Sequence, residues 1–317
     1  MVRSSTLVTA DIDVFAEAIS DGLSAEYVQL ESTAFHSEWT LVRGRALVAQ
    51  FARQNTAVAR RTRVPADRWA FVIPLHVTAA ARWDGRSVRP DEILVCPPGA
   101  ESLAFDPAHT HFAIVSAPIG SSLARLAGLR VAATASEPIA LPCPATASFL
   151  RRRLEDLGTR AASNRTVTLV GIRASLEAAL ALPGTHASEA PLVETPVRKR
   201  RIVYRAEAFV RGRVSECVSV AELSKLTGVS ERSLRNAFYD VYSTSPKRYI
   251  QLCRLHRVRR ALRAIRGDGK TVTEVATDHG FFELGRFAGA YKSLFGEAPS
   301  ETLSQARKDA DAGRRAF

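Results

Sequence analysis

The sequence has few cysteines and no long apolar run, and both shortages narrow the class of protein. Its four cysteines stand far apart without paired spacing, at Cys96, Cys143, Cys217 and Cys253. That pattern argues against a zinc module or a disulfide framework and is typical of a reducing compartment. No run approaches the roughly 18 apolar residues of a membrane span, and the first residues lack the apolar core of a signal peptide. We therefore expect a cytoplasmic protein with no membrane partner.

Sequence motifs for catalysis are also missing. We find no glycine-rich phosphate loop and no G-x-S-x-G elbow, so we expect no catalytic residue and no cofactor. His109 and His111 form an H-x-H pair, which on a strand would point both imidazoles to one face and could begin a metal site. No carboxylate or third histidine follows at a suitable spacing, so we expect no metal. A cupin-type metal-dependent enzyme stays as an alternative, with Asp106, His109 and His111 as the cluster to test.

Positive charge, by contrast, is abundant and lies in one part of the chain. The 317 residues carry a net charge of +12. Residues 1–197 hold 19 Lys+Arg and 19 Asp+Glu, whereas residues 198–317 hold 25 Lys+Arg and 13 Asp+Glu. A segment with that surplus is typical of nucleic-acid binding, although a solvated basic surface would have the same composition.

The first half reads as strands followed by helices. From about residue 26 to 116, short β-branched and aromatic runs alternate with turn signals, and Asp84-Gly85 predicts a hairpin. Many short strands with Pro and Gly corners favour an antiparallel β barrel or jelly roll. From about residue 145 to 181 two apolar stripes at helical spacing follow, which either pack on the strands or form a dimer seam. The stripe residues are Phe149, Leu150, Leu154 and Leu157, then Leu169, Ile172, Leu176 and Leu180.

Proline, glycine and small residues between Leu182 and Pro196 predict an interdomain linker, at residues 183–197. We therefore expect an α+β chain of two domains: residues 1–182 for sensing and dimerisation, and residues 198–305 as an all-α domain. Residues 306–317 are expected to be a frayed basic tail.

The all-α domain repeats one pattern. Around Leu223, an apolar face is followed by Gly228, which permits a left-handed turn, and by Ser230, a natural N-cap for a helix over 231–242. The second copy has Gly280 as its turn residue, 52 residues after Gly228, and Phe287 and Tyr291 lie 53 residues after Leu234 and Phe238. Two helix-turn-helix units joined by an arginine-rich helix could enter successive major grooves of one DNA duplex.

The stretches "LSKLTGVSERSLRNAF", "SPKRYIQLCRLHRVRRAL" and "VTEVATDHGFFELGRFAGAYKSLFGEAP" resemble the DNA-binding domain of the AraC/XylS family of transcription regulators. The resemblance implies a regulator that binds double-stranded promoter DNA, often as a homodimer, with an N-terminal cupin-like effector module. Ser243 departs from the family, which usually has a glycine there, as at Gly296.

Carried over onto this sequence, the resemblance assigns base reading in the first motif to Arg232, Arg235 and Asn236, because arginine suits guanine and asparagine suits adenine. The second motif has small outward residues, including Gly285 and Gly289, so we expect it to touch mainly the DNA backbone or thymine methyls. Arg254, Arg257 and Arg260 could add phosphate contacts. The full set of expected DNA contacts is Arg232, Ser233, Arg235, Asn236, Tyr239, Lys247, Arg248, Glu283, Arg286 and Lys292.

An arginine-rich stretch in the first half predicts an effector site. Guanidinium groups suit phosphate or carboxylate ligands, and nearby tryptophans could stack on a planar ring. An anionic nucleotide such as a cyclic dinucleotide (c-di-GMP, for instance) would fit this combination, although a solvated arginine-rich edge strand would look the same. The candidate residues are Arg60, Arg61, Arg63, Arg68, Trp69, Arg82, Trp83 and Arg86. The remaining alternative is a DNA-binding protein without an effector.

Overall fold

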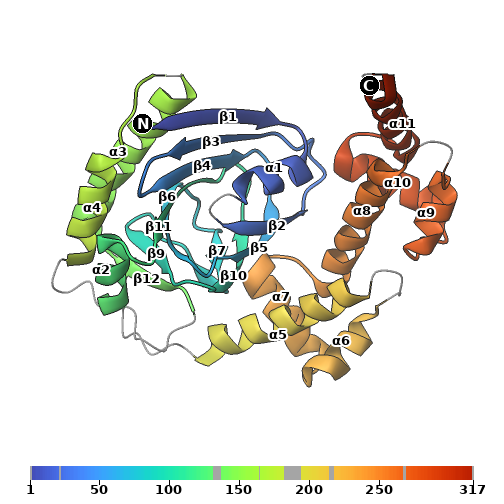
Figure 1. The fold of residues 1–317 in the computed structure, drawn as a ribbon. Helices are drawn as coiled ribbons and strands as arrows, with labels where there is room; N and C mark the ends of the chain where they lie inside the picture. The colour runs from blue at the N-terminus through green and yellow to red at the C-terminus, as the bar shows by residue number, and fades with distance from the viewer. Residues whose placement is uncertain are drawn as a thin grey trace. The chain divides into compact units, whose positions relative to one another are not determined.

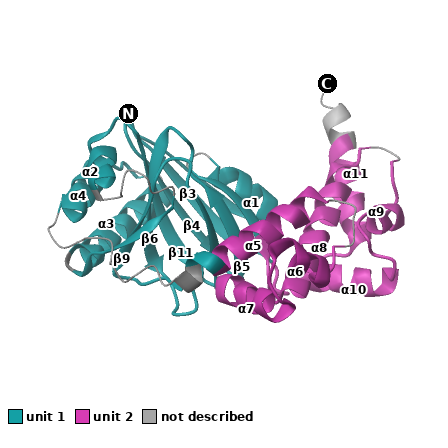
Figure 2. Ribbon diagram, turned by 90° about the horizontal axis from the view of Figure 1, so that it is seen from below, with its two compact units in different colours: residues 1–27, 35–198 teal, residues 28–34, 199–317 magenta. Residues whose placement is uncertain are grey.

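The computed structural model describes residues 2–20, 23–130, 137–163, 165–181, 194–213, 218–266 and 269–315. The chain forms two compact units, coloured separately in Figure 2. Unit 1 comprises residues 1–27 and 35–198, and unit 2 comprises residues 28–34 and 199–317. The short segment Val28–Ala34 therefore groups with the C-terminal half of the chain.

Unit 1 is built on two β-sheets whose described pairings are antiparallel (Figure 1). The seven-stranded sheet has the order β1 (Arg3–Thr9), β3 (Ser37–Arg43), β4 (Val48–Gln54), β11 (His111–Pro118), β6 (Arg68–His76), β9 (Glu92–Cys96) and β12 (Ile139–Pro142). The five-stranded sheet has the order β2 (Ser24–Gln29), β5 (Val58–Arg63), β10 (Glu101–Asp106), β7 (Arg82–Trp83) and β8 (Arg86–Ser87). Within the described strands neither sheet closes on itself, so the fold is compatible with the predicted jelly roll and is not a closed barrel.

The central strand β11 is covered on both faces, and its side chains alternate between two apolar cores. Phe112 and Ile114 belong to the core that contains Trp83 of the five-stranded sheet. Ala113 and Val115 belong to the core formed with three helices, α2 (Ser122–Arg130), α3 (Pro144–Ala162) and α4 (Val170–Ala181). The predicted helical stripes therefore pack on the seven-stranded sheet, except for Phe149, which is 46% exposed.

The predicted hairpin is confirmed. Asp84 and Gly85 have φ angles of 51° and 83° and join β7 to β8. Two successive positive φ values define the turn whose twist matches that of paired strands. The Asp84 carboxylate also accepts a hydrogen bond from the Leu103 N–H at 2.8 Å, which ties the turn to β10.

The C-terminal part of unit 2 is helical in its described residues (Figure 1). The helix α8 (Pro246–Ala264) connects two helix pairs, as predicted, and none of the described helices is long and apolar enough to cross a bilayer. The other helices are α5 (Glu194–Gly212), α6 (Val220–Thr227), α7 (Glu231–Tyr242), α9 (Val272–Asp278), α10 (Leu284–Phe295) and α11 (Pro299–Arg315).

Two predicted irregular segments are helical. Residues 183–193 of the predicted linker lie outside the described residues, but residues 194–197 form the first turn of α5. Ile202, Val203 and Ala206 of this helix are buried, so packing against the rest of unit 2 stabilises a helix that its charged sequence did not reveal. The predicted frayed tail is wrong up to residue 315, because α11 continues through it.

Four elements of unit 1 were not predicted: β1, α1 (Ile12–Ile19), α2 and β12. The strand β1 is polar and mostly exposed, and it forms because its backbone pairs with β3 from Arg3 to Thr9. Strands fixed by backbone pairing rather than by an apolar pattern give little signal in the sequence.

Candidate nucleic-acid interface

The first helix-turn-helix unit is fixed by capping at each of its junctions. Ser219 and Glu222 form a reciprocal capping box at the start of α6. Gly228 ends that helix with a left-handed φ of 69°, and its N–H reaches the carbonyls of Lys225 and Ser224. The Ser230 side chain then accepts the N–H of Ser233 and starts α7. Short-range signals alone set this turn, and the predicted roles of Gly228 and Ser230 are confirmed.

The helix α7 has a buried face and an exposed face. Leu234, Ala237, Phe238 and Val241 are all 0% exposed. The side chains at the i, i+3, i+4 and i+7 positions of the opposite face are solvent-exposed, and Tyr239 is 51% exposed. These four residues, all expected DNA contacts, are Arg232, Arg235, Asn236 and Tyr239. Ser233, the remaining expected DNA contact on α7, accepts a hydrogen bond from the Ser230 hydroxyl at 3.0 Å, so its side chain takes part in capping.

The start of α8 places two further expected contacts beside its N-cap, Ser245. Lys247 is exposed, while Arg248 is half-buried and its backbone N–H bonds to the Ser245 hydroxyl at 3.2 Å. Lys247 is therefore better placed than Arg248 to meet a phosphate.

Two half-buried arginines of α8 form hydrogen bonds within unit 2. Arg254 donates to the Val218 carbonyl at 3.1 Å, and Arg257 donates to the carbonyls of Val210 at 2.6 Å and Arg213 at 3.3 Å. Burial lowers the pKa of Arg257 from its ordinary value. Both arginines therefore have a structural role, because they donate to backbone carbonyls at and beyond the C-terminal end of α5.

The second helix-turn-helix unit has small residues on the exposed face of α10. A Cβ added at Gly285 or Gly289 of α10 would meet nothing within 4 Å, so this surface is open. Of the polar residues expected there, Glu283 and Arg286 pair with each other at 2.8 Å, and Lys292 is exposed. The polar groups on this face are therefore fewer than on α7.

Phe282 is an exposed residue that the sequence reasoning missed. It is 73% exposed and stands in the turn before α10, where Leu284 is 38% exposed. The preceding Phe281 packs on Phe287, with ring centroids 4.9 Å apart. The sequence feature that could have revealed Phe282 is the doubled phenylalanine in "GFFEL", because only one of the two rings is needed for the core contact.

A buried carboxylate links α5 to the first helix-turn-helix unit. Glu207 is 1% exposed and accepts hydrogen bonds from the Tyr242 hydroxyl at 2.8 Å and from the Tyr249 hydroxyl. The two tyrosine rings stack, with centroids 5.2 Å apart, and burial raises the pKa of both hydroxyls. This cluster packs α5, α7 and α8 together, so it positions the exposed face of α7.

In unit 1 the arginines of the predicted effector site have protein partners. Arg60 is 3% exposed and forms two hydrogen bonds with Asp106, at 2.7 and 3.2 Å. Its guanidinium lies 5.1 Å from the Trp83 ring centroid, and Trp83 is itself 2% exposed. On the same strand, Arg61 and Arg63 both approach Glu101, at 2.7 and 3.6 Å.

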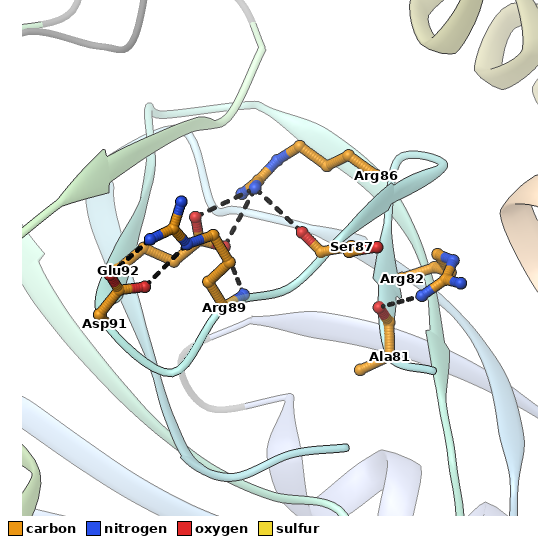
Figure 3. A network of polar contacts seen from close by, with 7 residues as sticks. All are labelled: Ala81, Arg82, Arg86, Ser87, Arg89, Asp91 and Glu92. Atoms are coloured by element: carbon orange, nitrogen blue, oxygen red, sulfur yellow. Dashed lines mark hydrogen bonds and ion pairs between the residues drawn. The ribbon is translucent and has the colours of Figure 1, made fainter. Parts of the chain in front are cut away.

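The remaining predicted effector residues are similarly engaged. Figure 3 shows Arg86 bonded to both Glu92 oxygens, at 3.0 and 3.1 Å, while Arg82 donates to the Ala81 carbonyl at 3.1 Å. Arg68 donates to the Ser116 carbonyl at 3.2 Å, and Trp69 is half-buried against the helix-covered core. The cluster is thus a set of separate intramolecular contacts rather than one convergent anion site.

The H-x-H pair does not lie on one strand face. His109 sits in a turn with a φ of 61°, and β11 begins only at His111. Burial, followed by the positive charge of Arg53, lowers the pKa of His111 to about 4. Among the described residues no group of three His, Cys, Asp or Glu side chains is placed to hold a metal ion. The alternation argument for a metal site is therefore wrong.

Comparison with known proteins points to one family. Residues 223–305 match a family described as a helix-turn-helix domain. The XylDLEGF operon transcriptional activator of Pseudomonas putida is 39% identical over 105 residues, which make up 33% of this chain and 33% of that protein. A "probable thc operon regulatory protein" of Rhodococcus erythropolis is 34% identical over 128 residues, 40% of this chain and 39% of that protein. The crystal structure of a "probable AraC family transcriptional regulator" from Rhodopseudomonas palustris is 34% identical and covers 34% of this chain and 98% of its own, with a TM-score of 0.31.

The relatives named here are regulators of transcription, and the C-terminal residues of this chain are similar to those of the AraC/XylS family. The chain spans about a third of the length of the curated relatives that it matches. The resemblance inferred from the sequence is confirmed, while the roles of individual residues stay predictions.

Proposed function

We propose that the protein is a sequence-specific DNA-binding regulator of transcription that acts in the cytoplasm. The observation that carries this proposal is the exposed face of α7, where Arg232, Arg235 and Asn236 stand together on a helix whose other face is buried. Residues 198–317 also hold the whole positive surplus of the chain, which favours association with the phosphate backbone.

The two helix-turn-helix units divide the work of recognition. The first supplies the guanidinium and amide groups that hydrogen-bond to guanine and adenine edges in the major groove. The second has an open face at Gly285 and Gly289 with the exposed Phe282 beside it. That unit suits close approach to the backbone and apolar contact with thymine methyls, so it contributes affinity more than sequence discrimination.

Regulation by a small anionic effector, and assembly as a homodimer, complete the proposal. A cyclic dinucleotide at the arginine cluster would have to displace Asp106, Glu101 and Glu92 from their guanidinium partners. The Arg60–Asp106 pair is buried, and breaking a buried ion pair is costly. We therefore assign the cluster a structural role and look for the effector elsewhere in unit 1.

The test begins with selection of preferred duplexes from a random library by the full-length protein. Arg235→Ala should weaken binding to the selected duplex by about 1–3 kcal/mol and relax one base position, with little change on random DNA. Arg286→Ala, on the second unit, serves as the matched control and should keep the base preference. Equal losses on selected and random duplex for Arg235→Ala would contradict base reading by α7.

Duplex selection tests one rival function, and the metal content of the purified protein tests the other. An effector-independent, non-specific DNA-binding protein would yield no preferred sequence at all. A metal-dependent enzyme would hold stoichiometric metal that is lost on His109→Ala and His111→Ala, although the turn at His109 does not favour this reading.

A further inference from the structure

Unit 1 contains a groove that neither DNA binding nor the arginine cluster uses. It lies between α3, the segment Thr166–Thr168 and the first turn of α4, two helices that stand next to each other in Figure 1. Its volume is about 650 Å³, and small-molecule sites typically enclose about 300–1,000 Å³. The groove is therefore large enough for a ring system or a short chain.

The floor of the groove is apolar. Leu157 and Ile172 line it while also belonging to the core between the helices and the sheet, and they are 5% and 3% exposed. Phe149 and Val167 extend this surface outward, and Phe149 is 46% exposed. An aromatic ring exposed to that extent beside a cavity can cover the apolar part of a ligand and lose its contact with water.

The rim of the groove is cationic. Three arginines line it, Arg152, Arg153 and Arg160, and Asp156 is the one acidic residue among the lining residues. Arg160 is held in place by donating to the Thr166 carbonyl at 3.1 Å, and its other terminal nitrogen lies 3.9 Å from Asp156. A pair at that distance on the surface is weak, so it leaves the guanidinium able to bind an anion.

Gly171 makes room for the central arginine of the rim. A Cβ at this position would lie 2.1 Å from Nη1 of Arg153, so the absence of a side chain lets the guanidinium reach across from α3 to the start of α4. The Cζ atom of Arg153 lies 5.0 Å from the ring centroid of Phe149. One cation therefore stands directly beside the exposed aromatic surface.

We propose that this groove binds a small amphipathic anion, whose apolar ring or short chain lies on Phe149, Leu157 and Ile172. Its carboxylate, sulfonate or phosphate group faces Arg153 and Arg160. Under the proposed function, on which this step rests, such a molecule is the effector of the regulator. A second copy of the chain on the same helices would bury the apolar floor but would leave three guanidinium groups to be matched, which favours the small anion.

The test uses the full-length protein and two fluorescent naphthalene probes. One is the anion 8-anilinonaphthalene-1-sulfonate, and the other is its uncharged relative N-phenyl-1-naphthylamine. The double variant Arg153→Ala/Arg160→Ala should raise the Kd of the sulfonate about tenfold or more, because two charged hydrogen-bond donors are lost. The Kd of the uncharged probe should change by less than about threefold.

Two further variants keep the result interpretable. Arg45→Ala removes an exposed arginine outside the groove and should leave both Kd values unchanged. Thr168→Trp places a large ring in the groove from an exposed position and should abolish binding of both probes. A sulfonate Kd that is the same in wild type, the double variant and Thr168→Trp would overturn the proposal.

Sedimentation of the same variants separates the rival occupant. If Thr168→Trp turned a dimer into a monomer while probe binding stayed as in wild type, the groove would be a seam between copies and the proposal would fail. DNA binding is measured in parallel without the probes. If the wild-type protein binds the probes as expected but shows no specific DNA binding, the proposed function fails and the groove stands. If it binds DNA specifically but the probe results fail, the groove proposal fails and the function stands.

Discussion

At the scale of single residues, the buried polar groups of unit 2 help to hold α7 in place. Glu207 is buried, accepts hydrogen bonds from the hydroxyls of Tyr242 and Tyr249, and lies 3.6 Å from the Arg211 guanidinium. A buried carboxylate that loses a donor keeps its desolvation cost without compensation. The cluster is therefore sensitive to the removal of one oxygen atom.

Replacing Tyr242 by Phe tests this dependence. Tyr242→Phe removes the hydroxyl that donates to Glu207 and should lower the free energy of unfolding of unit 2 by about 1–3 kcal/mol. Urea titration gives the change as a shift of the midpoint at constant slope. Tyr239→Phe, which removes a hydroxyl from the exposed face of α7, is the control and should shift the midpoint much less. Similar shifts for both variants would contradict a stabilising role for the Glu207 cluster.

His256 is a second buried polar residue with a measurable consequence. Its side chain is 0% exposed, and its Nε2 accepts the Gln29 N–H at 3.0 Å. Gln29 lies in the segment Val28–Ala34, which groups with unit 2. Burial, followed by the charges of Arg260 and Arg259, lowers the pKa of His256 to about 3 from an ordinary 6.5. The folded protein thus holds the ring neutral, as an acceptor must be.

The sign of the resulting pH dependence follows from linkage. Because the folded pKa lies below the unfolded one, the unfolded chain takes up the proton first as the pH falls through 6.5. The contribution of His256 is complete above that pH and should fall by about 2 kcal/mol between pH 7 and pH 5. His256→Gln keeps a hydrogen-bond acceptor but does not titrate, so its stability should depend less on pH. Parallel urea midpoints for the two proteins across this range would contradict the assignment.

At the scale of elements, the two helix-turn-helix units differ at the residues that end α7 and α10. Ser243 ends α7 with a φ of 52°, and Gly296 ends α10 with a φ of 76°. Both are left-handed conformations, which cost a residue with a Cβ roughly 1–2 kcal/mol. The first helix-turn-helix unit therefore contains backbone strain at Ser243 that the second unit avoids with Gly296.

Exchanging the two residue types should move stability in opposite directions. Ser243→Gly relieves the left-handed strain at a small entropic cost and should stabilise unit 2 by up to about 1 kcal/mol. Gly296→Ser introduces the strain and should destabilise the unit by about 1 kcal/mol or more. Thermal and urea unfolding report both changes. A destabilised Ser243→Gly protein would mean that the serine side chain has a contact worth more than the strain.

These elements also show which parts of the structure the sequence could predict. The bounds of α7, the turn at Gly228 and the hairpin at Asp84 depend on neighbours within a few residues, so their signals are local. The helix α5 and the role of Glu207 depend on tyrosines 35 and 42 positions away. The partners of Arg60, Arg61 and Arg86 in unit 1 are carboxylates on other strands. No residue pattern reveals such pairs before the chain is folded.

At the scale of the whole molecule, the arginines and lysines of unit 2 divide into exposed side chains and side chains that bond within the unit. The sequence has 25 basic residues after position 197, but Arg254 and Arg257 donate to backbone carbonyls of unit 2. Net charge therefore overstates the number of phosphate contacts that the protein can make. The salt dependence of binding measures the real number, because each neutralised phosphate releases condensed counterions.

Comparing an exposed and an internal cation makes this measurable. Lys247→Ala, at the exposed start of α8, should weaken binding to all duplexes alike and make the slope of log K against log salt about one unit shallower. Arg254→Ala should leave the slope unchanged and lower the stability of unit 2, since it removes the bond to the Val218 carbonyl. Fluorescence anisotropy with one selected and one random duplex, at several salt concentrations, gives both slopes. If Arg254→Ala lost a full unit of slope while Lys247→Ala did not, the assignment of DNA-facing and internal cations would be reversed.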